Sequence, residues 1–411
     1  MAHRTSTWHL DGLELTDHLL DVPWDHDDPD GRRIEVFARV VAADDGRDRP
    51  YLVFLQGGPG QESPRPSVTP SGPAWLNRAL RDYRVVLLDQ RGTGRSTPYG
   101  GTVTDPAADA AYLTRFRADA IVRDAELLRE ALGVQRWSLL GQSFGGFCSL
   151  HYLSTAAGSL TEVYVTGGLP PVGRPPEDVY AATHARMRTL VERHYATFPD
   201  DRARLRAVVE RAERGEVRLL DGTPVAPRRL QGLGYQLGMD GGSLALHYLL
   251  ERDPASPAFA ADLHDLLPFS GRNPLYAVIH ESSYADGHAT RWAGDRTMPD
   301  DVRADPTLLT GEHVFAWHFA DCPDLAPYRE VAQILADHPW PRLYDPDALA
   351  AADVPVAAAV YADDPYVDRT FSEETAALLP DARLWVNDHL HNALRVAGEE
   401  VLDRLIGMVR G

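Results

Sequence analysis

Short apolar runs, separated by stretches with helical spacing, dominate the first 170 residues of the chain. Each run has the length and composition of a buried parallel strand. The runs lie at residues 51–55, 85–88, 137–140 and 163–165. Residues 118–132 repeat apolar side chains along one helical face, and Gly133 ends that pattern. Strands that alternate with helices predict an α/β fold with a doubly wound, mostly parallel sheet.

A further strand is predicted ahead of these runs. Residues 33–42 alternate between apolar and polar positions, which is typical of an antiparallel strand at the edge of a sheet. The preceding residues 25–31 are charged and contain Pro29 and Gly31, so they predict a turn.

The pattern changes from about residue 169. A proline-rich segment leads into long amphipathic stretches such as residues 185–214, and no buried strand run appears before residues 354–361. A strand at 383–386 and a final helix at 394–409 follow. We therefore predict an α/β core formed by residues 1–168 and 354–411, with a mainly helical cap inserted at residues 169–353.

Charge and composition narrow the class of protein. The chain has 411 residues, of which 44% are hydrophobic, and a net charge of −19 without a basic run, so nucleic acid and anionic membranes are not expected as partners. Cys148 and Cys322 are expected to be buried thiols rather than a disulfide. The first residues lack an apolar signal core, and no apolar run approaches ~20 residues, so we expect a cytoplasmic protein.

The most informative local sequence is Gly141-Gln142-Ser143-Phe144-Gly145, which has the pattern G-x-S-x-G. It lies between the apolar run at 137–140 and a helical stretch at 147–153. A tight strand-to-helix turn needs small residues two before and two after the serine, because the backbone is crowded there. The pattern predicts that Ser143 is a nucleophile, and the alternative is a glycine-rich turn with an idle serine.

A serine nucleophile needs a base, and that base needs a carboxylate to orient it. On α/β-hydrolase scaffolds the three arrive in the order Ser, Asp or Glu, His, each after a strand. The candidate acids after residues 354–361 are Asp363, Asp364 and Asp368, with Asp388 a lesser one, and the candidate bases after residues 383–386 are His389 and His391. Spacing leaves both choices open. We expect no metal and no cofactor, because no carboxylate ligand pattern accompanies the two histidines.

An oxyanion hole is the third requirement of this chemistry, and it needs backbone N–H groups directed at the developing charge. One would come from Phe144, directly after the serine. The other is predicted at Gly58, in the glycine-rich loop 56–60 that follows the first apolar run. A simple turn is the alternative for that loop, and it matches no phosphate-binding pattern.

Three motifs in order carry a family resemblance. They are Gln56-Gly57-Gly58-Pro59-Gly60, then Leu88-Asp89-Gln90-Arg91-Gly92-Thr93-Gly94-Arg95-Ser96, then Gly141-Gln142-Ser143-Phe144-Gly145-Gly146. Together they resemble the proline iminopeptidase (prolyl aminopeptidase) family of α/β-hydrolase serine peptidases. Gln56 departs from the histidine that is usual there and resembles the longer bacterial branch. The resemblance is strong over residues 35–170 and 354–409 and looser over the cap.

The resemblance implies an activity and selects residues that spacing left open. It implies Asp364 as the acid and His391 as the base, and release of N-terminal proline from small peptides with a free amine. Family members bind that amine with glutamates of the cap. Glu281 fits this position best, and Glu251 and Glu312 fit it less well. The oligomeric state is not predicted.

Two other functions are consistent with the same residues. A carboxylesterase on this fold would use the same Ser-His-Asp set on a small neutral ester and would need no carboxylate in the cap. A non-catalytic binding protein with this fold would not need the set at all.

Overall fold

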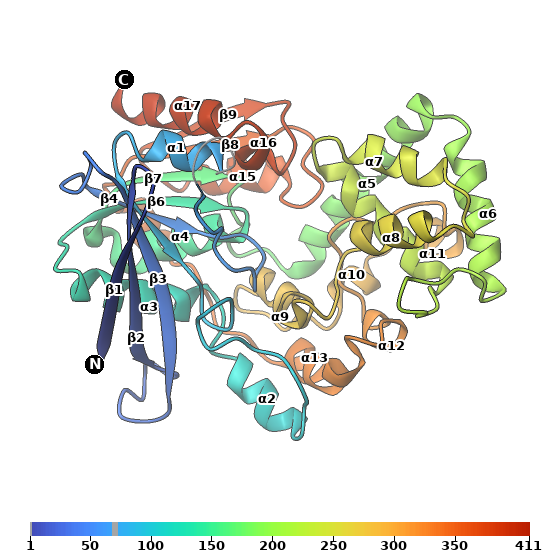
Figure 1. Cartoon of the computed structure of the whole chain (residues 1–411), viewed down its shortest axis with the longest axis horizontal. Coiled ribbons are helices and arrows are strands. Elements are labelled where there is room, and N and C mark those ends of the chain that lie inside the picture. Colours follow the sequence, from blue (N-terminus) through green and yellow to red (C-terminus); the bar gives the residue numbers. More distant parts are fainter. Residues whose placement is uncertain (1, 68–72) are drawn as a thin grey trace.

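The strands of the chain pair into one mixed sheet in which parallel pairs predominate. The computed structural model describes residues 2–67 and 73–411, and within these ranges nine strands have the order β1-β2-β3-β5-β4-β6-β7-β8-β9 (Figure 1). The strands are β1 (His3–Leu10), β2 (Leu13–Pro23), β3 (Arg33–Ala43), β4 (Tyr51–Leu55), β5 (Arg84–Leu88), β6 (Trp137–Gln142), β7 (Leu160–Thr166), β8 (Val356–Tyr361) and β9 (Ala382–Asn387). The pairs β1–β2, β2–β3 and β3–β5 are antiparallel and the other pairs are parallel, which confirms the predicted sheet.

Helices cover both faces of the sheet, because the central strands are apolar on both faces. In β4, Val53 and Leu55 face one layer, whereas Leu52 and Phe54 face the other. The first layer contains α3 and α4, and the second contains α1 and α17. The helices of this part are α1 (Ala74–Ala79), α2 (Pro106–Leu113), α3 (Ala118–Ala131), α4 (Phe144–Ala156), α15 (Arg369–Ala376), α16 (Ala393–Val396) and α17 (Gly398–Arg410).

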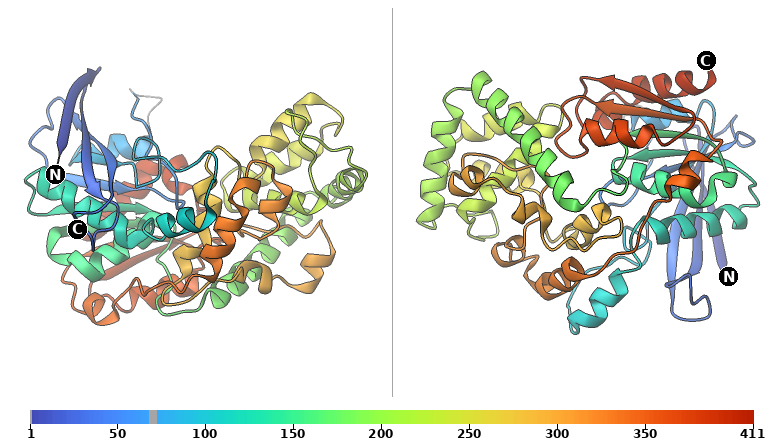
Figure 2. Two further views of the ribbon diagram at one scale, coloured as in Figure 1. Left: turned by 90° about the horizontal axis from the view of Figure 1, so that it is seen from below. Right: turned by 180° about the vertical axis from the view of Figure 1, so that it is seen from behind.

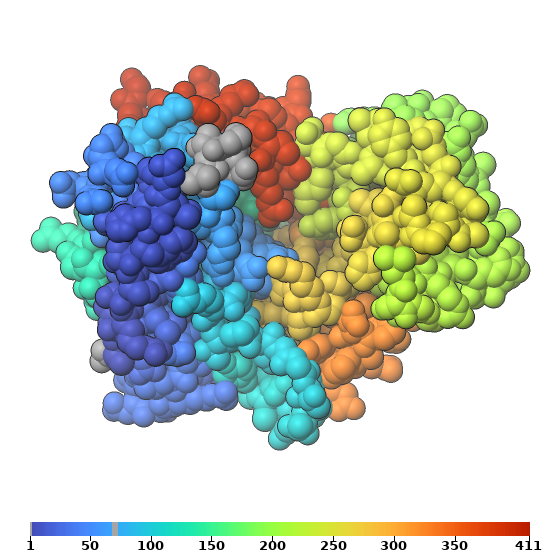
Figure 3. Space-filling view, in the orientation of Figure 1, coloured from blue at the N-terminus to red at the C-terminus, as the bar shows by residue number. Residues whose placement is uncertain are grey.

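The segment between β7 and β8 is helical and lies beside the sheet (Figures 1 and 2). Its helices are α5 (Pro176–Thr197), α6 (Asp201–Glu213), α7 (Gly242–Leu250), α8 (Pro257–Leu266), α9 (Pro274–Ile279), α10 (Ala293–Arg296), α11 (Asp300–Ala304), α12 (His318–Asp321), α13 (Arg329–Asp337) and α14 (Pro346–Ala350), with 3-10 helices at Pro227–Gly238, His280–Tyr284 and Ala326–Tyr328. In residues 169–353 the one β pairing is an isolated bridge between Arg218 and Pro224. The surface is hollowed between this segment and the rest of the molecule (Figure 3).

The prediction that residues 33–42 form an edge strand is wrong in one respect. This strand, β3, is antiparallel but lies inside the sheet, because β2 pairs with it on the side away from β5. The edge strand on this side of the sheet is β1, whose side chains are mostly exposed. β1 and β2 mix polar and apolar residues without long apolar runs, so their sequences have no buried-strand signal. The predicted turn between β2 and β3 is present at residues 24–32.

Two stretches that the sequence predicted as continuous helices are each divided into two helices in the structure. The stretch 185–214 is divided between α5 and α6, because Pro199 disfavours a helical backbone at the residue before it and offers no N–H of its own. The final stretch 394–409 is divided between α16 and α17 at Ala397, whose φ of −126° is not helical. By contrast, α3 lies where the sequence predicted it, and Gly133 follows its end with a φ of +67°.

Cys148 and Cys322 are buried free thiols, as predicted. Among residues 2–67 and 73–411, no helix has both the length and the apolar composition that crossing a membrane requires.

Candidate active site

Ser143 stands at a sharp turn between β6 and α4. Its φ of +56° lies in the left-handed region, which a residue with a side chain adopts only under strain. The two flanking glycines are required by close backbone contacts. A Cβ atom at Gly145 would lie 1.8 Å from the carbonyl oxygen of Leu55, and one at Gly141 would lie 2.4 Å from that of Gly145. The turn is therefore built for glycine at both positions, and it holds the serine at the carboxyl end of the sheet.

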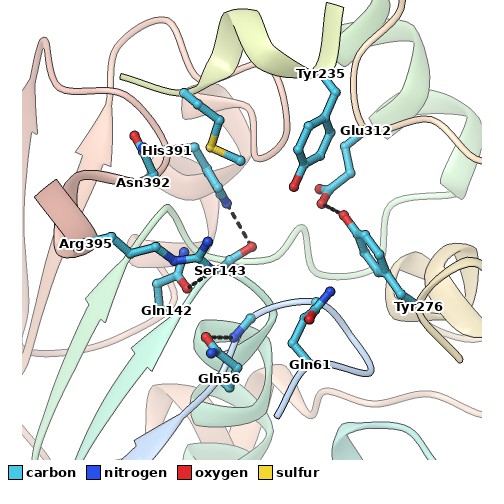
Figure 4. Close-up of a pocket in the computed structure, with 13 residues that line it drawn as sticks. Gln56, Gln61, Gln142, Ser143, Tyr235, Tyr276, Glu312, His391, Asn392 and Arg395 are labelled. Atoms are coloured by element: carbon cyan, nitrogen blue, oxygen red, sulfur yellow. Dashed lines mark hydrogen bonds between the residues drawn. The ribbon is translucent and has the colours of Figure 1, made fainter. Parts of the chain in front are cut away.

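Three side chains from distant parts of the chain meet at this turn. The imidazole Nε2 of His391 is 2.9 Å from the Oγ of Ser143, and its Nδ1 is 2.7 Å from the Oδ2 of Asp364. Figure 4 shows the contact between His391 and Ser143. The exposed fractions are 7% for Ser143, 4% for His391 and 1% for Asp364. This arrangement orients the imidazole so that Nε2 can accept the serine proton.

The loop after β8 prepares Asp364 for this contact. Its Oδ1 accepts the backbone N–H groups of Tyr366, at 2.9 Å, and Val367, at 3.2 Å, which leaves Oδ2 for the imidazole. Burial lowers the pKa of His391, but the carboxylates of Asp364 and Glu312 outweigh it and raise this pKa above its ordinary value. The imidazole is therefore a stronger base than a free histidine.

The other candidates in these loops lie elsewhere. Asp363 forms ion pairs with Arg186 and Arg193. Asp368 caps the N-terminus of α15, where its Oδ1 accepts the N–H of Thr370 at 2.8 Å. Asp388 is exposed, and the nearest carboxylate to His389 is Glu400, at 4.0 Å. Of the acids and bases that spacing left open, Asp364 and His391 are the pair in contact, and His391 is the one that reaches Ser143.

A segment of the cap holds the histidine loop in place. The N–H of His391 donates to the carbonyl of Gly238 at 3.0 Å, and the N–H of Asp240 donates to Oδ1 of Asn392 at 2.8 Å. Gly238 also packs on Tyr366, where a Cβ atom would lie 2.4 Å from the ring. The cap therefore helps to set the position of the imidazole.

The two residues predicted to form the oxyanion hole are Phe144 and Gly58. Phe144 is the first residue of α4, and the first N–H groups of a helix have no acceptor within it. The side-chain Oε1 of Gln56 accepts the N–H of Gly57 at 2.9 Å, whereas the N–H of Gly58 has no backbone or side-chain acceptor among the described residues. Gly57 and Gly58 both border the cavity described next.

A cavity of about 150 Å³ opens over the serine, and we call it the Ser143 cavity (Figure 4). Its walls come from both the sheet and the cap. They consist of Gln56, Gly57, Gly58, Gln61, Gln142, Ser143, Tyr235, Met239, Tyr276, Glu312, His391, Asn392 and Arg395. Of these residues, the sequence assigned a role in the site to Gly58, Ser143, Glu312 and His391. Gln56, Gly57 and Gln142 belong to the recognised motifs but were given no role. No local motif marks the others, which are Gln61, Tyr235, Met239, Tyr276, Asn392 and Arg395.

Glu312 is the carboxylate of the cap that reaches the Ser143 cavity. Its side chain is 9% exposed, accepts a hydrogen bond from the Tyr276 hydroxyl and lies 3.6 Å from Nε2 of His280. Burial raises the pKa of Glu312, but the neighbouring His280 and His391 rings and the Tyr276 hydroxyl together outweigh burial. The pKa of Glu312 therefore lies below its ordinary value. The cavity therefore contains an ionised carboxylate.

Glu281, which the resemblance favoured for amine binding, does not line the Ser143 cavity. It lines a separate cavity of about 10 Å³ beside α13, where Oε1 accepts the N–H of Gly294 at 3.1 Å. Its Oε2 has no hydrogen-bond partner among the described residues. Glu251 is half-exposed after the end of α7, beside His247. Of the three predicted glutamates, the structure brings only Glu312 to Ser143.

We expect Glu281→Gln to stabilise the protein at about pH 8 and to have little effect at about pH 5. Burial raises the pKa of Glu281 to about 7 from its ordinary value of 4.5, although the Gly294 N–H opposes the shift. As the pH rises from 4.5 to about 7, Glu281 loses its proton in the unfolded chain but keeps it in the folded protein, so the free energy of unfolding falls. The full loss of unfolding free energy is about 3 kcal/mol. Glutamine does not ionise, so it avoids this loss, and its amide oxygen can still accept the Gly294 N–H. Urea unfolding of both proteins at the two pH values measures the effect, and an equal difference at both would contradict it.

No cluster of three or more His, Cys, Asp or Glu side chains that could hold a metal ion is present in residues 2–67 and 73–411.

Comparisons with known proteins place the chain in a family. A model of the alpha/beta hydrolase fold matches residues 50–218. The chain is 43% identical to a proline iminopeptidase of Aeromonas sobria over 98% of both sequences. It is 33% identical to the proline iminopeptidase aneH of Aspergillus aculeatus, over 98% of this chain and 93% of that protein. A probable proline iminopeptidase of Streptomyces coelicolor is 37% identical, over 28% of this chain and 32% of its own. As its motifs predicted, this chain belongs to the proline iminopeptidase family, on the α/β-hydrolase fold.

Proposed function

We propose that this protein is a serine aminopeptidase that releases proline from the N-terminus of peptides. The observation that carries the proposal is the buried, ionised Glu312 in the same small cavity as Ser143 and His391. A carboxylate there pairs with a free N-terminal ammonium and leaves room for one residue before the cleaved bond. The two relatives that match nearly the whole chain, both proline iminopeptidases, support proline as that residue.

In the first half of the reaction, the Oγ of Ser143 attacks the carbonyl carbon of the N-terminal proline. The hydroxyl proton passes to Nε2 of His391, and Asp364 stabilises the imidazolium that forms. The oxyanion accepts hydrogen bonds from the N–H groups of Gly58 and Phe144. Loss of one such donor typically lowers the rate by ~10²–10³.

In the second half, the C–N bond breaks and His391 gives its proton to the leaving amine. A water molecule then attacks the acyl-enzyme, with His391 again as the base. Proline leaves as the free acid, and Ser143 recovers its proton.

Glu312 also distinguishes this proposal from an esterase. A hydrolase for small neutral esters needs the same three side chains but has no use for an ionised carboxylate beside them, because a neutral ester has no cation for that carboxylate to bind. A non-catalytic protein, in turn, has no need of the strained backbone at Ser143 or of the aligned imidazole.

The test compares three substrates: proline β-naphthylamide, N-acetyl-proline β-naphthylamide and a simple p-nitrophenyl ester. We expect fast cleavage of proline β-naphthylamide and no cleavage of its N-acetyl derivative, because acetylation removes the charge that Glu312 binds. Turnover of the ester with neither amide would favour a carboxylesterase, and turnover of none would favour a binding protein.

Two further expectations belong to this proposal. We propose residues 169–353 as the cap domain and the remainder as the core. We also propose a cytoplasmic location and peptides, rather than nucleic acids, as partners of this acidic chain.

A further inference from the structure

The Ser143 cavity contains a cation as well as an anion, and the mechanism above uses only the anion. Arg395 lies in α16, four residues after His391, and lines the cavity. In Figure 4 its guanidinium and the carboxylate of Glu312 lie on opposite sides of Ser143. Ser143 therefore lies between an anionic side chain, Glu312, and a cationic one, Arg395.

Among the described residues, the guanidinium of Arg395 has no ion-pair partner. No carboxylate of the described residues lies within 4.0 Å of it, and its hydrogen-bond partner is the Oε1 of Gln142, at 3.5 Å. Arg395 is an exposed residue even though it borders the cavity, so it lies where the cavity opens to solvent. An arginine is always charged, and its planar fork of N–H donors matches a carboxylate.

The reaction places the leaving residue on this side of the serine. His391 must give its proton to the leaving nitrogen, so that nitrogen lies against Nε2 in the reaction. In a dipeptide, the carboxylate carbon is two bonds, or about 2.5 Å, from the same nitrogen. A free carboxylate therefore follows directly after the cleaved bond. With the ammonium held at Glu312, it extends past Ser143 to the opposite side, where Figure 4 shows Arg395.

We propose that Arg395 binds the free α-carboxylate of the leaving residue, so that the enzyme prefers prolyl dipeptides to longer or C-terminally blocked peptides. This inference rests on the proposed aminopeptidase function. A zwitterionic dipeptide would satisfy Glu312 with its ammonium and Arg395 with its carboxylate. The cavity of about 150 Å³ supports a short substrate, since pockets that hold drug-sized ligands measure roughly 300–1,000 Å³.

The test compares prolyl-alanine with prolyl-alaninamide, which differ only in the carboxylate. For the unmodified enzyme we expect a kcat/KM about tenfold higher for the free acid, in the range of a hydrogen bond between charged groups at a partly exposed site. Arg395→Gln should lower kcat/KM for prolyl-alanine about tenfold relative to kcat/KM for prolyl-alaninamide. Arg395→Lys keeps the charge and should retain part of the preference.

The ratio of the two substrates separates binding from an indirect effect. The charge of Arg395 lowers the pKa of His391, so its removal can change both rates, but it changes them together. Arg404→Gln is the matched control, because Arg404 is an exposed arginine of α17 that does not line the cavity, and it should keep the native ratio. A ratio near one in the unmodified enzyme, or an equal loss on both substrates in Arg395→Gln, would overturn the role of Arg395 alone. Failure to release proline from either compound would overturn the proposed function and this inference with it.

Discussion

Ser143→Ala is expected to reduce the turnover of proline β-naphthylamide by about 10⁴–10⁶-fold, since nucleophile, base and acid act as one unit. The hydroxyl that forms the acyl bond is lost, and His391 then has no proton to accept. The fold should remain intact, because the backbone N–H of Ser143 keeps its bond to the carbonyl of Thr166, at 2.8 Å. Activity, together with labelling by a serine-directed phosphonate, measures the effect.

Ser154→Ala is the control for this variant. Ser154 lies on the same helix, α4, and its Oγ accepts the N–H of Asp345 at 3.3 Å, outside the Ser143 cavity. It should be labelled and turn over like the native protein. Near-native activity of Ser143→Ala, or phosphonate labelling that persists in it, would exclude Ser143 as the nucleophile.

Glu312→Gln is expected to lower kcat/KM for proline β-naphthylamide by about a hundredfold or more, and to have a much smaller effect on a p-nitrophenyl ester, where only the change in His391 basicity is felt. The substitution keeps the size of the side chain and an acceptor for the Tyr276 hydroxyl, but it removes the charge. Breaking a buried ion pair from one side costs about 3–5 kcal/mol, and only the substrate with an ammonium forms that pair. Kinetics on both substrates measure the difference.

The other two glutamates provide the comparison. Glu281→Gln should change kcat/KM only a few-fold, because Glu281 faces a different cavity, and Glu251→Gln should have no effect, because Glu251 is half-exposed beyond α7. A large loss in Glu281→Gln with a small one in Glu312→Gln would return the amine site to the residue that the family resemblance favoured. Equal losses of Glu312→Gln on amide and ester would assign Glu312 a positioning role instead.

The parts of the fold that could be predicted are those with strong local signals. β4, β5, β6, β7 and β8 are buried on both faces, so their apolar runs stand out in the sequence. β1 and β2 form an antiparallel ribbon with exposed positions, and they have no comparable signal. The breaks in the helical stretches depend on single residues, Pro199 and Ala397, within otherwise continuous patterns.

The sequence by itself determined the turn around Ser143, the order of the three proposed residues and the family. These features are visible in short stretches of sequence, such as the glycines two before and two after the serine. Gly141 is needed because the turn itself comes too close for a side chain, and Gly145 because the backbone of Leu55, in the neighbouring strand, does. Spacing left Asp363 and Asp364 open, the family resemblance selected Asp364, and the structure places Asp364 against His391. Only the tertiary structure decided between Glu281 and Glu312 as the carboxylate near Ser143. It also brought Arg395 to the same cavity. The reason is physical: residues one or two apart in a loop differ in the direction of their side chains. Glu312 is far from Ser143 in the sequence and reaches its cavity only through the packing of the cap against the core.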